Sequence, residues 1–159
     1  MRAVLAACML GAAAAAPADV LRNWFDDPFF AVSSAVADCP RPAGPFVDER
    51  ERAVQSHHRA ERGTTCWLAG ECERPNAYAY DRDIADAARR ALDGRPELAA
   101  TSLWITVQGR IVFVEGCAAD AAAVAAVEQR LRALPRVQQV LLLVRIGAGA
   151  RVPYRRFEP

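Results

Sequence analysis

Apolar and polar residues alternate on both sides of Gly109-Arg110, near the middle of the chain. Alternation with a period of two is typical of half-buried strands, and a two-residue loop that begins with glycine is typical of a hairpin with a type II′ turn. The pattern therefore predicts two antiparallel strands over residues 103–116. The pairs expected to form their buried face are Val107 with Val112 and Ile105 with Val114.

The hairpin is flanked by two stretches in which apolar residues recur with the helical period. Before the hairpin, residues 84–92 follow this period, with Asp81 or Asp83 placed to cap a helix and Gly94 placed to end it. After the hairpin, Asp120 is placed to cap a second helix.

Pro135 should end this second helix, and the apolar run at residues 140–146 predicts a third strand. The order helix, strand, strand, helix, strand predicts an α/β (α+β) fold over residues 81–146, a two-layer sandwich with both helices on one face of the sheet. The connection between the second and third strands should be a right-handed crossover.

Residues 19–80 form an extension before this unit. The extension is rich in aromatic residues near its start, where a solvated linker would be poor in them, and we expect it to be folded. Three prolines within residues 40–45 forbid regular structure there. Residues 48–62 predict a largely exposed helix that ends at Gly63.

The face of the sheet that points away from the helices should carry large apolar side chains, because alternation places them there. These are Trp104, Ile111, Phe113, Leu141 and Leu143. An exposed apolar patch of this kind usually marks a covered surface or an interface. We expect the extension to cover it with its aromatic side chains, and homodimerisation through the same face is the alternative. The expected covering side chains are Trp24, Phe25, Phe29, Phe30 and Trp67.

The first residues indicate an export signal. Residues 1–18 combine a charged start, an alanine-rich apolar run and a small-residue cleavage site, and we expect cleavage after Ala18 and a periplasmic location. The run is too short for a transmembrane span. Cys8 resembles the cysteine of a lipoprotein signal, but the apolar stretch before it is too short, so lipidation is not the favoured interpretation.

Charge excludes several functions. Loss of residues 1–18 removes one arginine and no acid, so 159 − 18 = 141 residues remain and the formal charge falls from +1 to zero. A neutral chain has no general attraction for nucleic acid. The chain contains no lysine, which excludes Schiff-base chemistry and a Walker A loop.

Four cysteines follow the export signal, and in an oxidising compartment an even number usually indicates disulfides. Of three possible connectivities we favour Cys66 with Cys72 and Cys39 with Cys117. The alternative is a metal- or redox-linked protein that uses His57 or His58 with Cys66 and Cys72. The spacing of these residues matches no known zinc or haem motif, so we expect no metal and no cofactor.

Three segments carry a family resemblance: the helix start Asp81-x-x-Ile84, the hairpin over residues 107–116 with Gly109 and Gly116, and residues 135–140. Together they resemble a BON domain, the module of bacterial osmotically inducible periplasmic and nodulation-associated proteins. The resemblance covers about 65 residues. Gln108 replaces the family's usual Asn, and Arg136 replaces its usual Gly.

The resemblance implies a non-catalytic, envelope-associated module that contacts phospholipid or other envelope components. The residues agree, because no paired carboxylates, triad or phosphate loop indicate an enzyme. Residues 147–159 predict a flexible tail in which cations and aromatics alternate, as at an anionic lipid surface. The expected contacts with envelope phospholipid or an envelope protein are Arg151, Tyr154, Arg155, Arg156 and Phe157.

Overall fold

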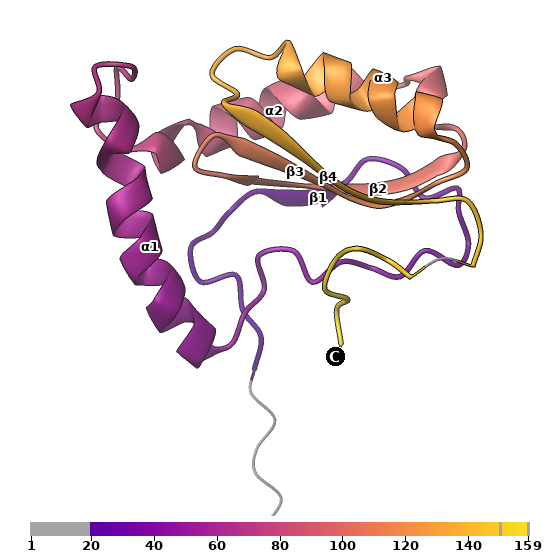
Figure 1. The fold of residues 1–159 in the computed structure, drawn as a ribbon, viewed down its shortest axis with the longest axis horizontal. Helices are drawn as coiled ribbons and strands as arrows, with labels where there is room; N and C mark the ends of the chain where they lie inside the picture. The colour runs from indigo at the N-terminus through magenta and orange to yellow at the C-terminus, as the bar shows by residue number, and fades with distance from the viewer. Residues whose placement is uncertain (1–19, 150, 159) are drawn as a thin grey trace, which may run out of the picture.

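A four-stranded mixed sheet forms the centre of the fold (Figure 1). The computed structural model describes residues 20–149 and 151–158, so the expected export signal and Cys8 lie outside the described residues. The strands lie in the order β1-β2-β3-β4. Their bounds are Phe29–Ala31, Thr101–Gln108, Ile111–Ala118 and Gln139–Ile146.

The predicted hairpin register is confirmed, since Val107 pairs with Val112 and Ile105 with Val114. The predicted type II′ turn is wrong. Both Gly109 (φ 60°) and Arg110 (φ 69°) adopt positive φ, which is the geometry of a type I′ turn. The reason is a side chain distant in sequence, whose carboxylate binds both turn amides, as described below.

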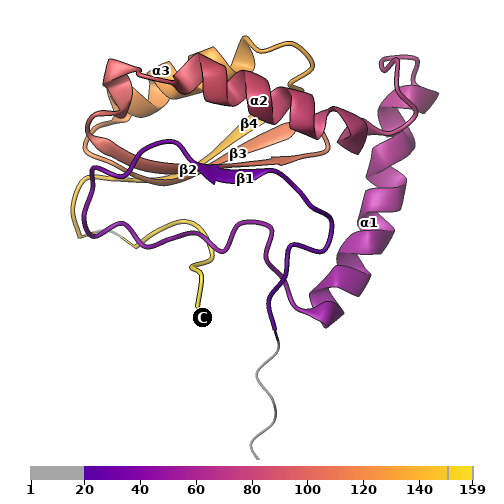
Figure 2. The ribbon, with the colours of Figure 1, turned by 180° about the vertical axis from the view of Figure 1, so that it is seen from behind.

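Two helices cover one face of the sheet, which we call the helix face (Figure 2). They are α2 (Asp81–Leu92) and α3 (Ala121–Arg132). The predicted cap of α3 is confirmed, because the Asp120 carboxylate accepts the N–H of Ala123 at 2.9 Å. The predicted cap of α2 is wrong, because the N-cap is Tyr80 and no side chain caps this end.

The core lies between these helices and the helix face. Strand β4 runs parallel to β3 after α3, as the predicted crossover requires. The core side chains from the sheet are almost fully buried, and β2 and β3 supply most of them. They include Leu103, Ile105, Val107, Val112, Val114 and Val140.

Gly116 allows the closest approach within the hairpin. A Cβ atom placed on it would lie 2.0 Å from the carbonyl oxygen of Ser102, and its φ of 144° disfavours any other residue. The backbones of β2 and β3 can therefore pair at this point only because residue 116 has no side chain.

The long helix α1 (Glu49–Leu68) stands beside the sheet, at the hairpin turn (Figure 1). Asp48 caps it through the N–H of Glu51, at 2.7 Å. The prediction that it ends at Gly63 is wrong. Gly63 is buried against Asn76, so this glycine provides space for packing and the helix continues past it. Two short 3-10 helices complete the fold, at Ala77–Tyr80 and Pro96–Leu98.

The opposite face, which we call the second face, is crossed by the extension and by the end of the chain (Figures 1 and 2). The predicted disulfide Cys39–Cys117 is present and joins the extension to β3. Ala43 and Val47 of the extension are buried, at 1% and 2% exposure. The segment between β1 and α1 therefore lies across the second face, whereas β1 joins the sheet and α1 stands beside it.

The prediction of which aromatic residues cover this face is partly wrong. The extension adds β1, a strand that was not predicted from the sequence. In this strand Phe29 points toward the second face and Phe30 points toward the core. Trp67 lies on α1 and is 47% exposed. Trp67 is therefore not part of a buried cover.

Candidate functional site

Arginines from two segments gather around an open groove at the end of β4. Arg145 comes from the strand, and Arg151 and Arg156 come from the segment that follows it. The groove has a volume of about 630 Å³, and one acidic residue, Asp38, also lines it. We call it the basic groove. Its three cations and one acid give a local formal charge of +2, although the whole chain is almost neutral.

Arg145 is only partly used by its neighbours. One terminal guanidinium nitrogen (Nη2) donates to the backbone carbonyl of Asp38 at 3.2 Å. Its Nε is buried and has no hydrogen-bond partner in the described part of the chain. The buried Nε is closed to the groove, so only the terminal nitrogens keep donor capacity for a group that enters it.

The other two arginines are exposed. Arg156 lies 3.8 Å from the Glu158 carboxylate, a surface pair worth little in water. Among residues 20–149 and 151–158, Arg151 forms no ion pair. An anion in the groove would thus compete with few internal partners.

The aromatic residues expected beside these arginines point inward. Tyr154 is 8% exposed, and its hydroxyl donates to the carbonyl of Pro40 at 2.6 Å. The same hydroxyl lies 3.5 Å from Sγ of Cys39, and burial raises the pKa of Tyr154 to about 12. This hydrogen bond ties the last segment to the extension.

Phe157 is also turned toward the protein. Its ring meets Phe46 edge-on at 6.0 Å, and the guanidinium of Arg41 lies 4.6 Å from its centroid. The backbone of Phe157 donates to the carbonyl of Arg41 at 2.9 Å. Residues 151–158 are thus attached to the extension, contrary to the predicted flexible tail, because these buried aromatic contacts outweigh the loss of chain entropy.

Arg155 lies outside the groove. Although exposed, its guanidinium donates to the carbonyl of Phe46 at 2.7 Å. Of the five predicted contact residues, Arg151, Tyr154 and Arg156 line the groove, with Tyr154 largely buried in its wall, and Arg155 and Phe157 lie elsewhere. Arg145 was not predicted, because it follows a run of five apolar strand residues and has no motif around it.

The second face also holds a buried carboxylate, Glu115, which is 8% exposed. Burial raises its pKa to about 7, and the charge of Arg155 opposes this shift only in part. Among the described residues it has no ion pair within 4.0 Å. A single carboxylate with no partner or nucleophile beside it does not make a catalytic site.

The histidine and cysteine residues of the metal hypothesis are not arranged as a site. Cys66 and Cys72 form the second predicted disulfide, which is confirmed. His57 and His58 are exposed on α1, and their only carboxylate neighbour in the described chain is Glu61. Within residues 20–149 and 151–158, no group of three or more histidine, cysteine or acidic side chains could hold a metal ion.

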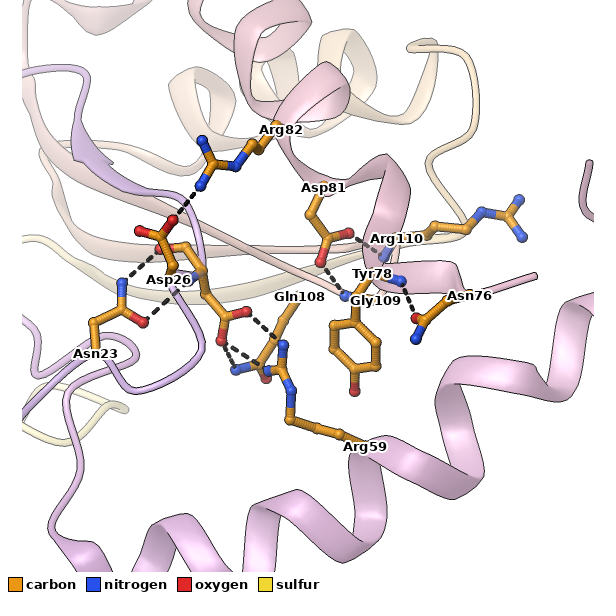
Figure 3. Close-up of polar contacts among 11 residues, drawn as sticks. Asn23, Asp26, Arg59, Asn76, Tyr78, Asp81, Arg82, Gln108, Gly109 and Arg110 are labelled. Atoms are coloured by element: carbon orange, nitrogen blue, oxygen red, sulfur yellow. Dashed lines mark hydrogen bonds and ion pairs between the residues drawn. The ribbon is translucent and has the colours of Figure 1, made fainter. Parts of the chain in front are cut away.

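A polar cluster joins α1, the extension and the hairpin (Figure 3). The Asp27 carboxylate accepts two hydrogen bonds from the Arg59 guanidinium, at 2.9 and 2.8 Å, and one from Gln108 Nε2 at 2.7 Å. The guanidinium also lies between the rings of Phe25 and Tyr78, 4.2 and 3.8 Å from their centroids. Every strong donor here has a partner, so the cluster holds α1 in place.

Asp81 stabilises the turn in the same region (Figure 3). Its carboxylate accepts the backbone N–H groups of Gly109 and Arg110, at 2.7 and 2.8 Å. Burial raises its pKa to about 6, although these two hydrogen bonds act in the opposite direction. From the sequence, Asp81 was a candidate helix cap, and no local signal indicated that its carboxylate would bind the hairpin turn.

Comparisons with models of known protein families, with curated proteins and with solved structures gave no match to this chain. In the described residues, no helix has the length and apolar character needed to cross a membrane.

Proposed function

We propose that this chain is an exported, non-catalytic protein of the bacterial envelope that binds anionic phosphate groups, and that the phospholipid headgroup is their source. The observation that carries the proposal is the basic groove. Arg145, Arg151 and Arg156 converge there with one acidic residue among them. The BON-like segments described above agree with an envelope role.

Arginine suits this ligand. Its planar guanidinium can donate two parallel hydrogen bonds to a phosphate, and it loses less hydration than an ammonium group when it does so. The Nε of Arg145 is buried, so a phosphate in the groove would bind to the terminal nitrogens of this guanidinium, whose one hydrogen bond in the described chain is to the Asp38 carbonyl. The terminal nitrogens of three guanidinium groups would therefore supply the donors.

Two features support location in the envelope. The first residues resemble an export signal, and disulfides persist in oxidising compartments such as the periplasm. The net charge of the expected mature chain is zero, so binding to an anionic surface would depend on the basic groove and not on the whole molecule.

Co-sedimentation with vesicles tests the proposal. We expect the protein to pellet with vesicles that contain phosphatidylglycerol, to remain in solution with pure phosphatidylcholine, and to bind less as salt increases. The triple variant R145Q/R151Q/R156Q should bind roughly a hundredfold more weakly, at about 1 kcal/mol for each arginine near an anionic surface.

The matched control is R50Q/R62Q/R90Q, which changes the net charge by the same amount at exposed sites on α1 and α2. An equal loss in this control would show that binding follows net charge and would contradict the groove. Titration with inorganic phosphate and with glycerol phosphate tests whether the groove binds a free phosphate as well as a phospholipid headgroup. Tight binding of free phosphate without vesicle binding would leave the groove as an anion site and reject the membrane.

A further inference from the structure

The two edges of the sheet differ in length and in protection. The β1 edge has three residues, whereas the β4 edge has eight. Edge strands of monomeric proteins are usually short, or carry charged residues, proline or a bulge, because an open row of backbone groups invites another strand to pair. In Figure 1, α3 lies above β4 and the end of the chain below it, and among residues 20–149 and 151–158 no strand lies beyond it.

The β4 edge has none of the usual protection along its centre. Residues 140–144 are Val-Leu-Leu-Leu-Val, without charge, glycine or proline. Val140 is buried, whereas the other four keep partial exposure. Both faces of β4 are thus apolar up to the edge, and another strand placed there would extend both apolar layers.

The hydrogen-bond pattern shows which residues of β4 are available to such a strand. In a parallel ladder, every second residue directs its N–H and C=O to the neighbouring strand, and the residues between direct theirs away. The N–H of Gly147, just after β4, donates to the carbonyl of Ala118 at 2.9 Å. Odd-numbered residues of β4 therefore direct their backbone groups toward β3. The even-numbered residues Val140, Leu142 and Val144 direct theirs toward the open edge.

This edge is complementary to itself. If two copies pair antiparallel about a twofold axis at Leu142, that residue meets its own counterpart and Val140 meets Val144 of the second copy. Each of these residues directs its N–H and C=O outward, so all form hydrogen-bonded pairs, with about six inter-chain bonds in total. On the second face Leu141 meets Leu143, and at the ends Gln139 meets Arg145, so no like charges are opposed.

Residues 140–144 have the same sequence in both directions, and the residues that would pair also direct their backbone groups outward. We therefore propose that the protein forms a homodimer through its β4 strands, with a continuous eight-stranded sheet. Homodimerisation through the second face was the alternative in the sequence analysis, but the extension lies across that face. The β4 edge is the long apolar edge that remains.

The twofold axis of such a dimer is perpendicular to the sheet, so equivalent faces of the two copies lie on the same side. The two basic grooves would then open toward one surface. This consequence rests on the proposed function, since two linked weak sites bind a surface far more tightly than either alone. The dimer itself is measured without vesicles, so its test is separate from that of the groove.

Sedimentation equilibrium of the full exported chain, purified with its disulfides intact, tests the dimer. We expect reversible dimerisation of the wild type, and we expect L141K and L143E each to weaken it by on the order of tenfold or more, because a charge then faces leucine across the interface. A mixture of the two variants should form a heterodimer, since the introduced lysine of one copy lies opposite the introduced glutamate of the other.

This rescue separates interface loss from misfolding, because a misfolded variant gains nothing from the mixture. A second measurement is amide hydrogen exchange. The amides of Leu142 and Val144 should exchange more slowly as the concentration rises, whereas those of Leu141 and Leu143 are already bonded within the chain and should not change. A wild type that stays monomeric at millimolar concentration, or a dimer that both variants leave intact, overturns the proposal.

Discussion

The two faces of the sheet are buried in different ways. The helix face is covered by α2 and α3, which lie next to it in sequence, and its contacts are mainly between aliphatic side chains, although Tyr80 belongs to the same cluster and Phe30 packs against it. The second face is covered by residues from both ends of the described chain. A disulfide joins the extension to β3, and Tyr154 and pairs of arginine and aromatic side chains join the last segment to the extension. Local periodicity specifies the first layer, whereas individual long-range contacts specify the second.

Arginine has a structural role in the second layer. The guanidinium of Arg41 lies within 6 Å of the rings of Phe29, Phe46 and Phe157. Arg59 is held between two rings in the same way. A planar cation can stack on an aromatic ring while it keeps its hydrogen bonds, which an ammonium group does less well. A chain without lysine is therefore suited to this kind of packing.

The largest effect should come from separating the two layers. The double variant C39S/C117S should lose about 4.5 kcal/mol of unfolding free energy on the chain-entropy estimate, and C66S/C72S, the matched control, about 2.4 kcal/mol. Urea denaturation of both variants provides the comparison. Equal losses would mean that the cover of the second face is held mainly by contacts other than its disulfide.

A smaller effect should come from the carboxylate beneath the sheet. Burial raises the pKa of Glu115 to about 7, so the folded state binds its proton more tightly than the unfolded chain does. Stability should therefore be greatest below the unfolded pKa, near 4.5, and should fall by roughly 3 kcal/mol as the pH rises to about 7. The variant E115Q should lack this decline and should be more stable than the wild type at pH 8.

Asp81 contributes a decline of the same sign at lower pH, because its pKa is raised to about 6. Thermal melts of E115Q should thus keep the shallower decline due to Asp81, between about pH 4 and 6, and lose the contribution of Glu115, which extends from about pH 4.5 to 7. The control is E73Q, at a side chain that is 84% exposed, and it should follow the wild type. An E115Q curve that overlays the wild-type curve would contradict the burial of this carboxylate.

The smallest effect should come from the anchor of the last segment. The variant Y154F removes the hydroxyl that donates to Pro40 and should cost about 1 kcal/mol. Proteolysis near residue 151 should become faster in this variant, while the helix face stays protected. Unchanged proteolysis would indicate that Phe157 and Arg41 hold the segment without help from Tyr154.

The sequence predicted the helix face well, for a physical reason. The hairpin register, the core positions of α2 and α3 and the parallel third strand all follow from local periodicity, and both disulfides follow from cysteine spacing and compartment. The type I′ turn was not predictable in this way. It depends on Asp81, which is 28 residues from the turn in sequence.

The same distinction holds for the basic groove. Arg151 and Arg156 stood out because cations and aromatics alternate near the end of the chain. Arg145 did not, because its place beside them depends on how the last segment turns under the sheet. The inward direction of Tyr154 and Phe157 is likewise a result of tertiary packing, since both exposed and buried segments can contain the same residues.

The spacing of the cysteines also affects the order of events during biosynthesis. Cys39 is the first of the four bonded cysteines in the chain, and its partner follows 78 residues later. Before that partner appears, Cys66 and Cys72 are the available competitors. These two are only 6 residues apart and close a far smaller loop with each other than either does with Cys39. We expect this pair to close first, which would leave Cys39 available for Cys117 when the hairpin forms.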